Sequence, residues 1–247
     1  MTAEVPAWLL EQPIAHRGLH DIDAGLPENS RSAFQAAVEA GYGIELDLQL
    51  SADGAAVVFH DSDLARMTDA EGPIGAKGAG ELGRLRLLDT EEKIPTLEEV
   101  LDDVRGRAPI LVEIKSWHAP LGHLEAAAWR HLRNYQEPFA VQSFDPASLA
   151  WFRHHAPAVT RGQLSQRFRR NRHGQPAWKR FLLRNLLLLG QSRPHVVGYD
   201  IDDLPHPVPA LARRLGLPVL AWTVKTPAQR EKARGLADNI IFEQIRP

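Results

Sequence analysis

The sequence predicts an α/β protein of the (β/α)8 TIM-barrel class, and three observations support this prediction. Short apolar segments alternate with amphipathic ones, which is the pattern of parallel strands joined by helices. Eight such units occur within 247 residues, which matches the roughly 250 residues of one barrel domain. No GxGxxG or GxxxxGKS phosphate loop follows a strand, so the open doubly wound sheet lacks its usual signature.

The chain opens with a short strand and a capped helix. Residues 13–18 are predicted to form a short buried strand that ends in a polar cluster. The following helix runs to about Ala40, where Gly41 ends it. Asn29 or Ser30 is placed to cap its first turn, because both side chains carry an oxygen that can accept from the free N–H groups there.

The next stretch, GIELDLQLSADGAAVVFH, is predicted to be a β-hairpin that carries charge on one face. Glu45 and Asp47 alternate with apolar residues, so both carboxylates lie on the same side of the strand. Asp53-Gly54 predicts a two-residue turn, which would place His60 opposite Asp47 with about 5 Å between Cβ atoms. Either a Mg²⁺ or Ca²⁺ ion lies between the carboxylates, or this is the solvated face of a surface hairpin.

An insertion follows the hairpin. Residues 61–93 are rich in glycine and charge and show weak periodicity, so we expect a small excursion with little core of its own. The next helix begins at Thr96, which can form a capping box with Glu99. We therefore expect a single domain, residues 1–247, that carries this insertion.

The rest of the chain alternates regularly between strands and helices. A basic loop after the fifth strand is the main interruption. Strands are expected at 110–115, 139–143, 159–164, 196–201, 218–224 and 239–242, and helices near 121–134, 147–155, 178–189, 208–215 and 227–235.

Polar side chains gather where these strands end. In a (β/α)8 barrel the active site lies at the C-terminal ends of the strands. Buried charges are costly unless they are paired or bind a metal, so this many strand ends with charged or hydrogen-bonding side chains indicate a site. The residues concerned are His16, Arg17, Glu45, Asp47, Glu113, Lys115, Gln142 and Trp222.

These residue types suit a metal-assisted reaction on a phosphate. Glu113 adds a third carboxylate to the pair on the hairpin, and such a set makes a hard-cation site that can also hold a substrate phosphate. Arg17 and Lys115 are natural phosphate contacts. His16 and His60 could flank the phosphorus as proton donor and acceptor, because imidazole titrates near neutral pH.

Each assignment has a structural alternative. A histidine at a strand end is often a satisfied structural residue, and Lys115 could simply pair with Glu113. Gln142 and Trp222 are expected to line the substrate pocket, although Trp222 taken alone could equally be a core residue.

Several motifs together resemble one enzyme family, the glycerophosphodiester phosphodiesterases. Their order and spacing cover nearly the whole chain, although each motif alone would be weak. The motifs are HRG at 16–18, PENS at 27–30, ELD at 45–47, DG at 53–54, VVFHD at 57–61, PTLEEVL at 95–101, VEIK at 112–115, QSF at 142–144 and AWTV at 221–224.

The resemblance implies an elongated barrel of the phospholipase C-like type, with one divalent cation, Mg²⁺ or Ca²⁺, held by the three carboxylates and with acid–base catalysis by His16 and His60. It also implies an insertion after the histidine strand. The chain departs from the family pattern at two places. Phe242-Glu243 stands where Thr-Asp is usual, and Lys225 replaces a common asparagine, so the alcohol-binding end differs.

The predicted activity is hydrolysis of a glycerophosphodiester to sn-glycerol 3-phosphate and an alcohol. A lysophospholipase D that uses the same site is the first alternative. A non-catalytic barrel that binds glycerophosphodiesters is the second, and a carboxylate-only glycosidase is disfavoured because the histidines and basic residues would have no role.

Composition sets the remaining expectations. A net charge of −2 argues against nucleic acid as a partner. The chain has no cysteine, which excludes a disulfide framework or thiolate site and fits a reducing compartment. The N-terminal stretch lacks a basic leader and a long apolar run, so we expect a cytoplasmic protein; the sequence predicts no oligomeric state.

One charge pattern is not explained by this function. From Pro146 to Tyr199 there is no Asp or Glu but ten Lys and Arg residues. Arginines at 167, 169, 170 and 172 precede Trp178 and Phe181, so a weak contact with an anionic lipid surface is one prediction. The alternative is a solvated rim whose arginines contact acidic loops.

Overall fold

The computed structural model describes residues 5–116, 119–169 and 175–247. Its strands are β1 (Ile14–Ala15), β2 (Gly43–Leu50), β3 (Ala56–Val58), β4 (Ile110–Ile114), β5 (Phe139–Ser143), β6 (Arg161–Ser165), β7 (Val196–Asp200), β8 (Val219–Val224) and β9 (Asn239–Phe242). They form one sheet in the order β1-β9-β8-β7-β6-β5-β4-β2-β3, and β1 also pairs with β2.

This strand order closes eight parallel strands into a (β/α)8 barrel, and the predicted fold class is confirmed. Residues 15–139 form one compact unit, and residues 1–14 with 140–247 form another. Among the described residues, none of the helices is long and apolar enough to cross a membrane.

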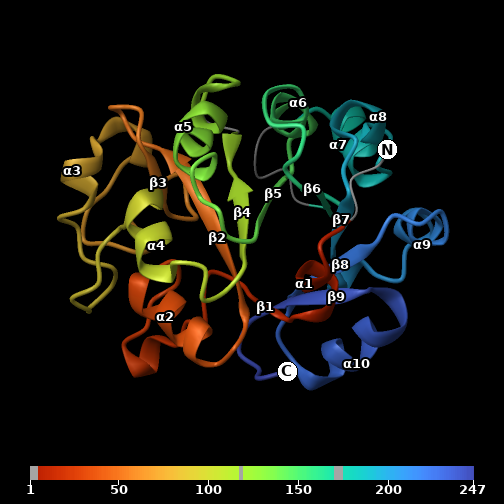
Figure 1. Cartoon of the computed structure of the whole chain (residues 1–247), viewed down its shortest axis with the longest axis horizontal. Helices are drawn as coiled ribbons and strands as arrows, with labels where there is room; N and C mark the ends of the chain where they lie inside the picture. Colours follow the sequence, from red (N-terminus) through yellow and green to blue (C-terminus); the bar gives the residue numbers. More distant parts are fainter. Residues whose placement is uncertain (1–4, 117–118, 170–174) are drawn as a thin grey trace. The chain divides into compact units, whose positions relative to one another are not determined.

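In the unit of residues 15–139, β2 lies between its two neighbours, with β4 parallel to it and β3 antiparallel (Figure 1). Every residue of β4 and nearly every residue of β2 is buried. The helices of this unit are α2 (Arg31–Glu39), α3 (Ala79–Leu82), α4 (Leu97–Val104) and α5 (His123–Leu132).

Two helix caps in this unit agree with those predicted from the sequence. The hydroxyl of Ser30 accepts a hydrogen bond from the N–H of Ala33 at 3.1 Å and caps α2. Thr96 and Glu99 form the predicted capping box at the start of α4, where the N–H of Thr96 donates to the Glu99 carboxylate at 2.8 Å. These caps fix where both helices begin.

The hairpin register differs from the prediction by one residue. Phe59, not His60, lies opposite Asp47, and the N–H of Phe59 donates to the Asp47 carbonyl at 2.9 Å. The predicted cross-strand pair of Asp47 and His60 is therefore wrong. His60 follows the end of β3 and approaches the carboxylates from the loop instead.

The cause lies in the length of the turn. The N–H of Ser51 donates to the carbonyl of Ala55 at 3.0 Å, so the loop holds three residues rather than two. Gly54, the last of them, has φ 79°, the left-handed conformation that follows a type I turn in three-residue hairpin loops. An Asp-Gly pair suits both loop lengths, so the dipeptide alone does not decide the register.

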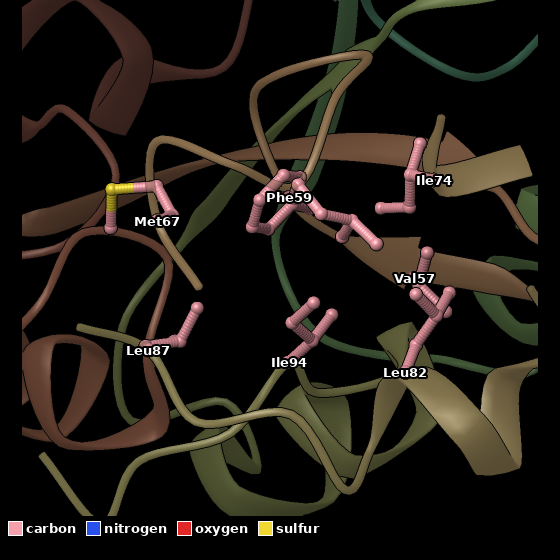
Figure 2. Close-up of a cluster of buried hydrophobic side chains, with 8 residues drawn as sticks. Val57, Phe59, Met67, Ile74, Leu82, Leu87 and Ile94 are labelled. Carbon is pink, nitrogen blue, oxygen red and sulfur yellow. The ribbon is translucent and has the colours of Figure 1, made fainter. Parts of the chain in front are cut away.

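The insertion has a core, contrary to expectation. Figure 2 shows its buried side chains gathered around Val57 and Phe59 of the hairpin's return segment. The insertion itself supplies residues at the irregular positions 64, 67, 74, 82 and 87, which follow neither a helical nor a strand period and so escape a periodicity analysis. The cluster comprises Val57, Phe59, Leu64, Met67, Ile74, Leu82, Leu87 and Ile94.

The other unit contains the remaining α/β repeats. The helix expected near 178–189 is split, because Leu186 adopts φ 54° and ends the regular helical backbone. A first helix not predicted from the sequence is held by Asn239, whose Nδ2 donates to the carbonyl of Leu9 at 3.0 Å. The helices are α1 (Ala7–Glu11), α6 (Pro146–His155), α7 (Ala177–Arg184), α8 (Leu189–Ser192), α9 (Pro207–Arg214) and α10 (Pro227–Leu236).

Candidate active site

Three carboxylates lie together on β2 and β4. The parallel register sets Asp47 beside Glu113, and Glu45 precedes Asp47 by two residues, so its side chain leaves the same face of β2. Glu45 and Asp47 are fully buried, and Glu113 is 6% exposed. One ligand oxygen from each of the three lies within 4.8 Å of the others, so the structure brings together the predicted metal-binding residues.

The charges of these carboxylates oppose one another. Burial, followed by the repulsion of Asp47 and Glu113, raises the pKa of Glu45 well above its usual range. A cation among the three oxygens would relieve this repulsion, and carboxylate oxygens are the donors that Mg²⁺ and Ca²⁺ prefer. The three residues therefore fit a divalent metal ion.

Basic side chains surround Asp47. The Nζ of Lys115 lies 3.2 Å from its Oδ1, and the Nε of Arg17 lies 3.2 Å from its Oδ2. Asn29 donates from Nδ2 to Oδ2 at 2.9 Å. Burial alone would raise the pKa of Asp47, but these cations, Lys115 foremost, lower it. Lys115 also contacts Glu113 at 2.9 Å, so the ion pair considered from the sequence is present.

A tight turn positions Arg17. Arg17 has φ 58° and Gly18 has φ 80°. A Cβ at position 18 would lie 2.8 Å from the carbonyl carbon of Ala33, so only glycine allows this close approach to α2. The backbone N–H of Arg17 donates to Glu45 at 3.0 Å, and its Nη1 donates to Glu28 at 2.8 Å. Backbone and guanidinium thus both hold acidic groups.

The two histidines lie in the same unit as the carboxylates. The Nε2 of His16 is 3.8 Å from the Oε2 of Glu45, and the residue is 9% exposed. The Nδ1 of His60 is 2.5 Å from the Oδ1 of Asp61. The charges of both histidines act on Asp47 and contribute to its lowered pKa. The structure therefore gathers both predicted acid–base groups near the carboxylates.

Four residues of this cluster were not predicted from the sequence to belong to the site. They lie in loops rather than at strand ends, so the expectation that active-site residues lie at the C-terminal ends of barrel strands does not identify them. The motifs PENS and VVFHD contain three of them, and these motifs were the available signal. The four are Glu28, Asn29, Asp61 and Arg66.

Residues 16–245 match the model of the glycerophosphoryl diester phosphodiesterase family. The chain belongs to this family. The resemblance seen in the motifs is therefore confirmed, and so is the prediction of an enzyme, since the family consists of phosphodiesterases.

Individual members of the glycerophosphoryl diester phosphodiesterase family agree with this assignment. A glycerophosphodiester phosphodiesterase of Caldanaerobacter subterraneus is 34% identical over 62% of this chain, and the matched stretch spans 66% of that relative. A glycerophosphodiester phosphodiesterase of Thermotoga maritima is 28% identical with a TM-score of 0.69, and 94% of each chain is covered. An Oleispira antarctica phosphodiesterase, solved with its product sn-glycerol-3-phosphate, shares the fold, with a TM-score of 0.77 at 24% identity over 95% of this chain and 93% of that one.

Gln142 and Trp222 lie in the other compact unit and are described within it. Gln142 is buried near the end of β5, and Trp222 is half-buried on β8. The Trp222 ring packs edge-on against Phe144 with 5.4 Å between centroids, and Phe144 packs against Phe168 at 6.1 Å. Their role as pocket residues remains a prediction.

The two departures from the family pattern contact each other. The Nζ of Lys225 lies 2.5 Å from the Oε2 of Glu243, and the Glu243 carboxylate is nearly buried. Removing one partner would leave a charge without its partner in a poorly solvated place. Lys225 and Glu243 therefore form an ion pair at the two places where the chain departs from the family pattern.

Proposed function

We propose that this chain hydrolyses glycerophosphodiesters to sn-glycerol 3-phosphate and an alcohol. The observation that carries the proposal is the convergence, within residues 15–139, of a carboxylate set that fits a divalent cation with Arg17, Lys115 and two histidines. Family membership adds the substrate class. A non-catalytic barrel that binds glycerophosphodiesters would not need the two histidines, and a carboxylate-only glycosidase would need neither the histidines nor the basic residues.

In this proposal the basic residues bind the phosphate and the histidines transfer protons. Arg17 and Lys115 bind the non-bridging phosphate oxygens. His60 removes the proton from the glycerol hydroxyl next to the phosphate, and that oxygen bonds to phosphorus as the bond to the alcohol breaks. His16 gives a proton to the departing alkoxide. Water then opens the cyclic diester, with the two histidines acting in reverse.

A divalent ion held by Glu45, Asp47 and Glu113 would neutralise the phosphate charge and lower the pKa of the attacking hydroxyl. Both Mg²⁺ and Ca²⁺ suit an all-carboxylate set, and either is proposed as the ion. The tight 4.8 Å grouping of the ligand oxygens supports binding of a single ion.

The first test is turnover of glycerophosphocholine with added Mg²⁺ or Ca²⁺. We expect release of sn-glycerol 3-phosphate and choline, and loss of this activity with EDTA that either cation restores. A coupled assay for sn-glycerol 3-phosphate measures it. Binding of the diester without product in the presence of both cations would favour the non-catalytic alternative.

We also propose a weak contact with an anionic lipid surface through α7, which favours lysophospholipids as additional substrates. Trp178 and Phe181 are 65% and 52% exposed, and their spacing of three residues puts them on one helix face. Leu183, on the opposite side, is buried. Arg184 lies 5.6 Å from the Phe181 ring centroid. An exposed apolar face flanked by cations is typical of interfacial helices.

The arginines of the preceding loop support this contact less than the helix does. Arg167 and Arg169 lie 3.7 and 3.2 Å from the Oδ1 of Asp203, which agrees with the alternative that they contact an acidic loop. Arg170 and Arg172 lie outside the described residues. The cytoplasmic location remains a prediction, which rests on the N-terminal stretch and on the absence of cysteine.

The lipid contact predicts a specific effect of Trp178→Ser with Phe181→Ser. Sedimentation with phosphatidylglycerol vesicles at low salt should weaken about tenfold or more, the size expected for losing one buried large apolar side chain. Turnover of lysophospholipids should fall, whereas turnover of glycerophosphocholine should not change.

The matched control is Leu211→Ser with Leu215→Ser on and just after α9, because these residues are 57% and 78% exposed and lie outside the basic stretch 146–199 of the sequence. This variant should bind vesicles like the unmodified protein. If the unmodified protein fails to bind at low salt, where surface charges are least screened, the lipid proposal is wrong.

A further inference from the structure

Asp61 connects His60 to the insertion. One oxygen of its carboxylate, Oδ1, contacts the Nδ1 of His60 at 2.5 Å. The other, Oδ2, accepts a hydrogen bond from the Nε of Arg66. A carboxylate bound at both oxygens has little freedom to rotate, so the imidazole that donates to it is held in one orientation with Nε2 left for chemistry.

Glu28 holds the other end of the Arg66 guanidinium. Nη1 donates to Oε2 at 3.0 Å and Nη2 donates to Oε1 at 2.6 Å, which is the two-pronged geometry of a strong arginine–carboxylate pair. The same Oε1 accepts from Arg17 at 2.8 Å. Arg66 is thus fixed between two acidic residues, each of which contacts a basic residue of the site.

The core of the insertion fixes the backbone of Arg66. Leu64 and Met67 are 0% and 4% exposed and belong to the hydrophobic cluster in Figure 2. The carbonyl of Met67 also accepts from the N–H of Leu88 at 2.7 Å. The core that the sequence did not predict therefore has a consequence, because it holds Arg66 in place.

The charges agree with this geometry. Partial burial would raise the pKa of Asp61, but its hydrogen bonds with His60 and Arg66 lower it, so the carboxylate stays ionised and accepts from both. The hydrogen bond to Glu28 raises the pKa of Arg66, which keeps its guanidinium charged.

We propose that Arg66 is a positioning residue that acts on His60 through Asp61, so that the insertion contributes to catalysis without touching the substrate. The proposal rests on the acid–base role of His60 proposed above.

A double-mutant cycle with metal-loaded protein tests this proposal. Arg66→Gln alone should lower kcat for glycerophosphocholine by about 10-fold to 10²-fold, the loss typical of removing an outer-shell contact, with KM changed by less than about threefold. In a His60→Ala background the same change should lower kcat by less than about twofold, because residues that act as one unit are not additive.

Two further variants separate positioning from folding. Arg66→Lys should recover only part of the loss, because an ammonium cannot form the two-pronged contact. Arg86→Gln is the matched control, since Arg86 lies in the same insertion and pairs with Glu91 at 3.0 Å. It should keep wild-type kcat, and both variants should keep the wild-type melting temperature within a few degrees.

The outcomes distinguish this inference from the proposed function. An equal loss of kcat from Arg66→Gln in both backgrounds would show that Arg66 does not act through His60. Full activity of Arg66→Gln beside an inactive His60→Ala variant would overturn the inference alone. Full activity of His60→Ala would overturn the proposed function itself.

Discussion

Replacing Glu113 with glutamine should remove most of the phosphodiesterase activity while leaving the fold intact. The amide keeps the shape of the side chain, but it removes one of the three negative charges that lie within 4.8 Å of one another. We expect a loss of at least about 10²-fold in kcat/KM, the upper end of the effect of an outer-shell contact, because a direct ligand is lost. Glu45→Gln and Asp47→Asn should behave alike.

The same substitution should not lower the thermal stability of the metal-free protein. Glu45 is fully buried beside Asp47 and Glu113, so neutralising Glu113 reduces the repulsion among the carboxylates. Lys115 loses its contact with Glu113 but keeps the one with Asp47 at 3.2 Å. We therefore expect the melting temperature of Glu113→Gln in EDTA to match or exceed that of the unmodified protein. Calorimetric titration with Mg²⁺ and Ca²⁺ should show weaker binding, and excess cation should restore activity only in part.

Asp53→Asn is the control for this series. Asp53 lies at the tip of the same hairpin and accepts from the hydroxyl of Ser51 at 2.5 Å and from the N–H of Ala79 at 3.0 Å, away from the cluster. The control should retain metal binding and turnover. Wild-type turnover by Glu113→Gln in chelator-treated buffer would show that the metal interpretation is wrong.

The carboxylate cluster was predictable from the sequence because two simple rules converge on it. Alternation along β2 puts Glu45 and Asp47 on one face, and the ends of parallel strands meet at one edge of the barrel. Together these rules bring Glu113 beside Asp47, as the register of β2 and β4 has it. Neither rule needs knowledge of loops.

Contacts made by loops could not be predicted in this way. The Asp-Gly pair at the hairpin tip suits loops of two or three residues, and this single choice moved His60 from the predicted position opposite Asp47. The contact between Arg66 and Glu28 joins residues 38 positions apart, and no local pattern reports such a pairing. It depends on a core with irregular spacing, which hydrophobic periodicity does not detect.

Removing either histidine should produce the second large loss of phosphodiesterase activity. His16→Ala and His60→Ala should each lower kcat by about 10²-fold to 10⁴-fold, the usual contribution of a positioned acid or base. His60 is oriented by Asp61 at 2.5 Å, and His16 lies 3.8 Å from Glu45. Both variants should fold, and His123→Ala, at an exposed position in the same unit, should keep wild-type activity.

A change of leaving group separates the two roles. A p-nitrophenyl diester of glycerol 3-phosphate releases an anion that needs no proton, so the variant that lacks the general acid should recover activity and the variant that lacks the general base should not. The proposed assignment predicts recovery for His16→Ala alone. Recovery for His60→Ala alone would exchange the roles, and equal recovery of both, or of neither, would contradict a division of labour. Because Arg66 acts through His60 in the proposed network, Arg66→Gln should follow His60→Ala in this assay and show no selective recovery.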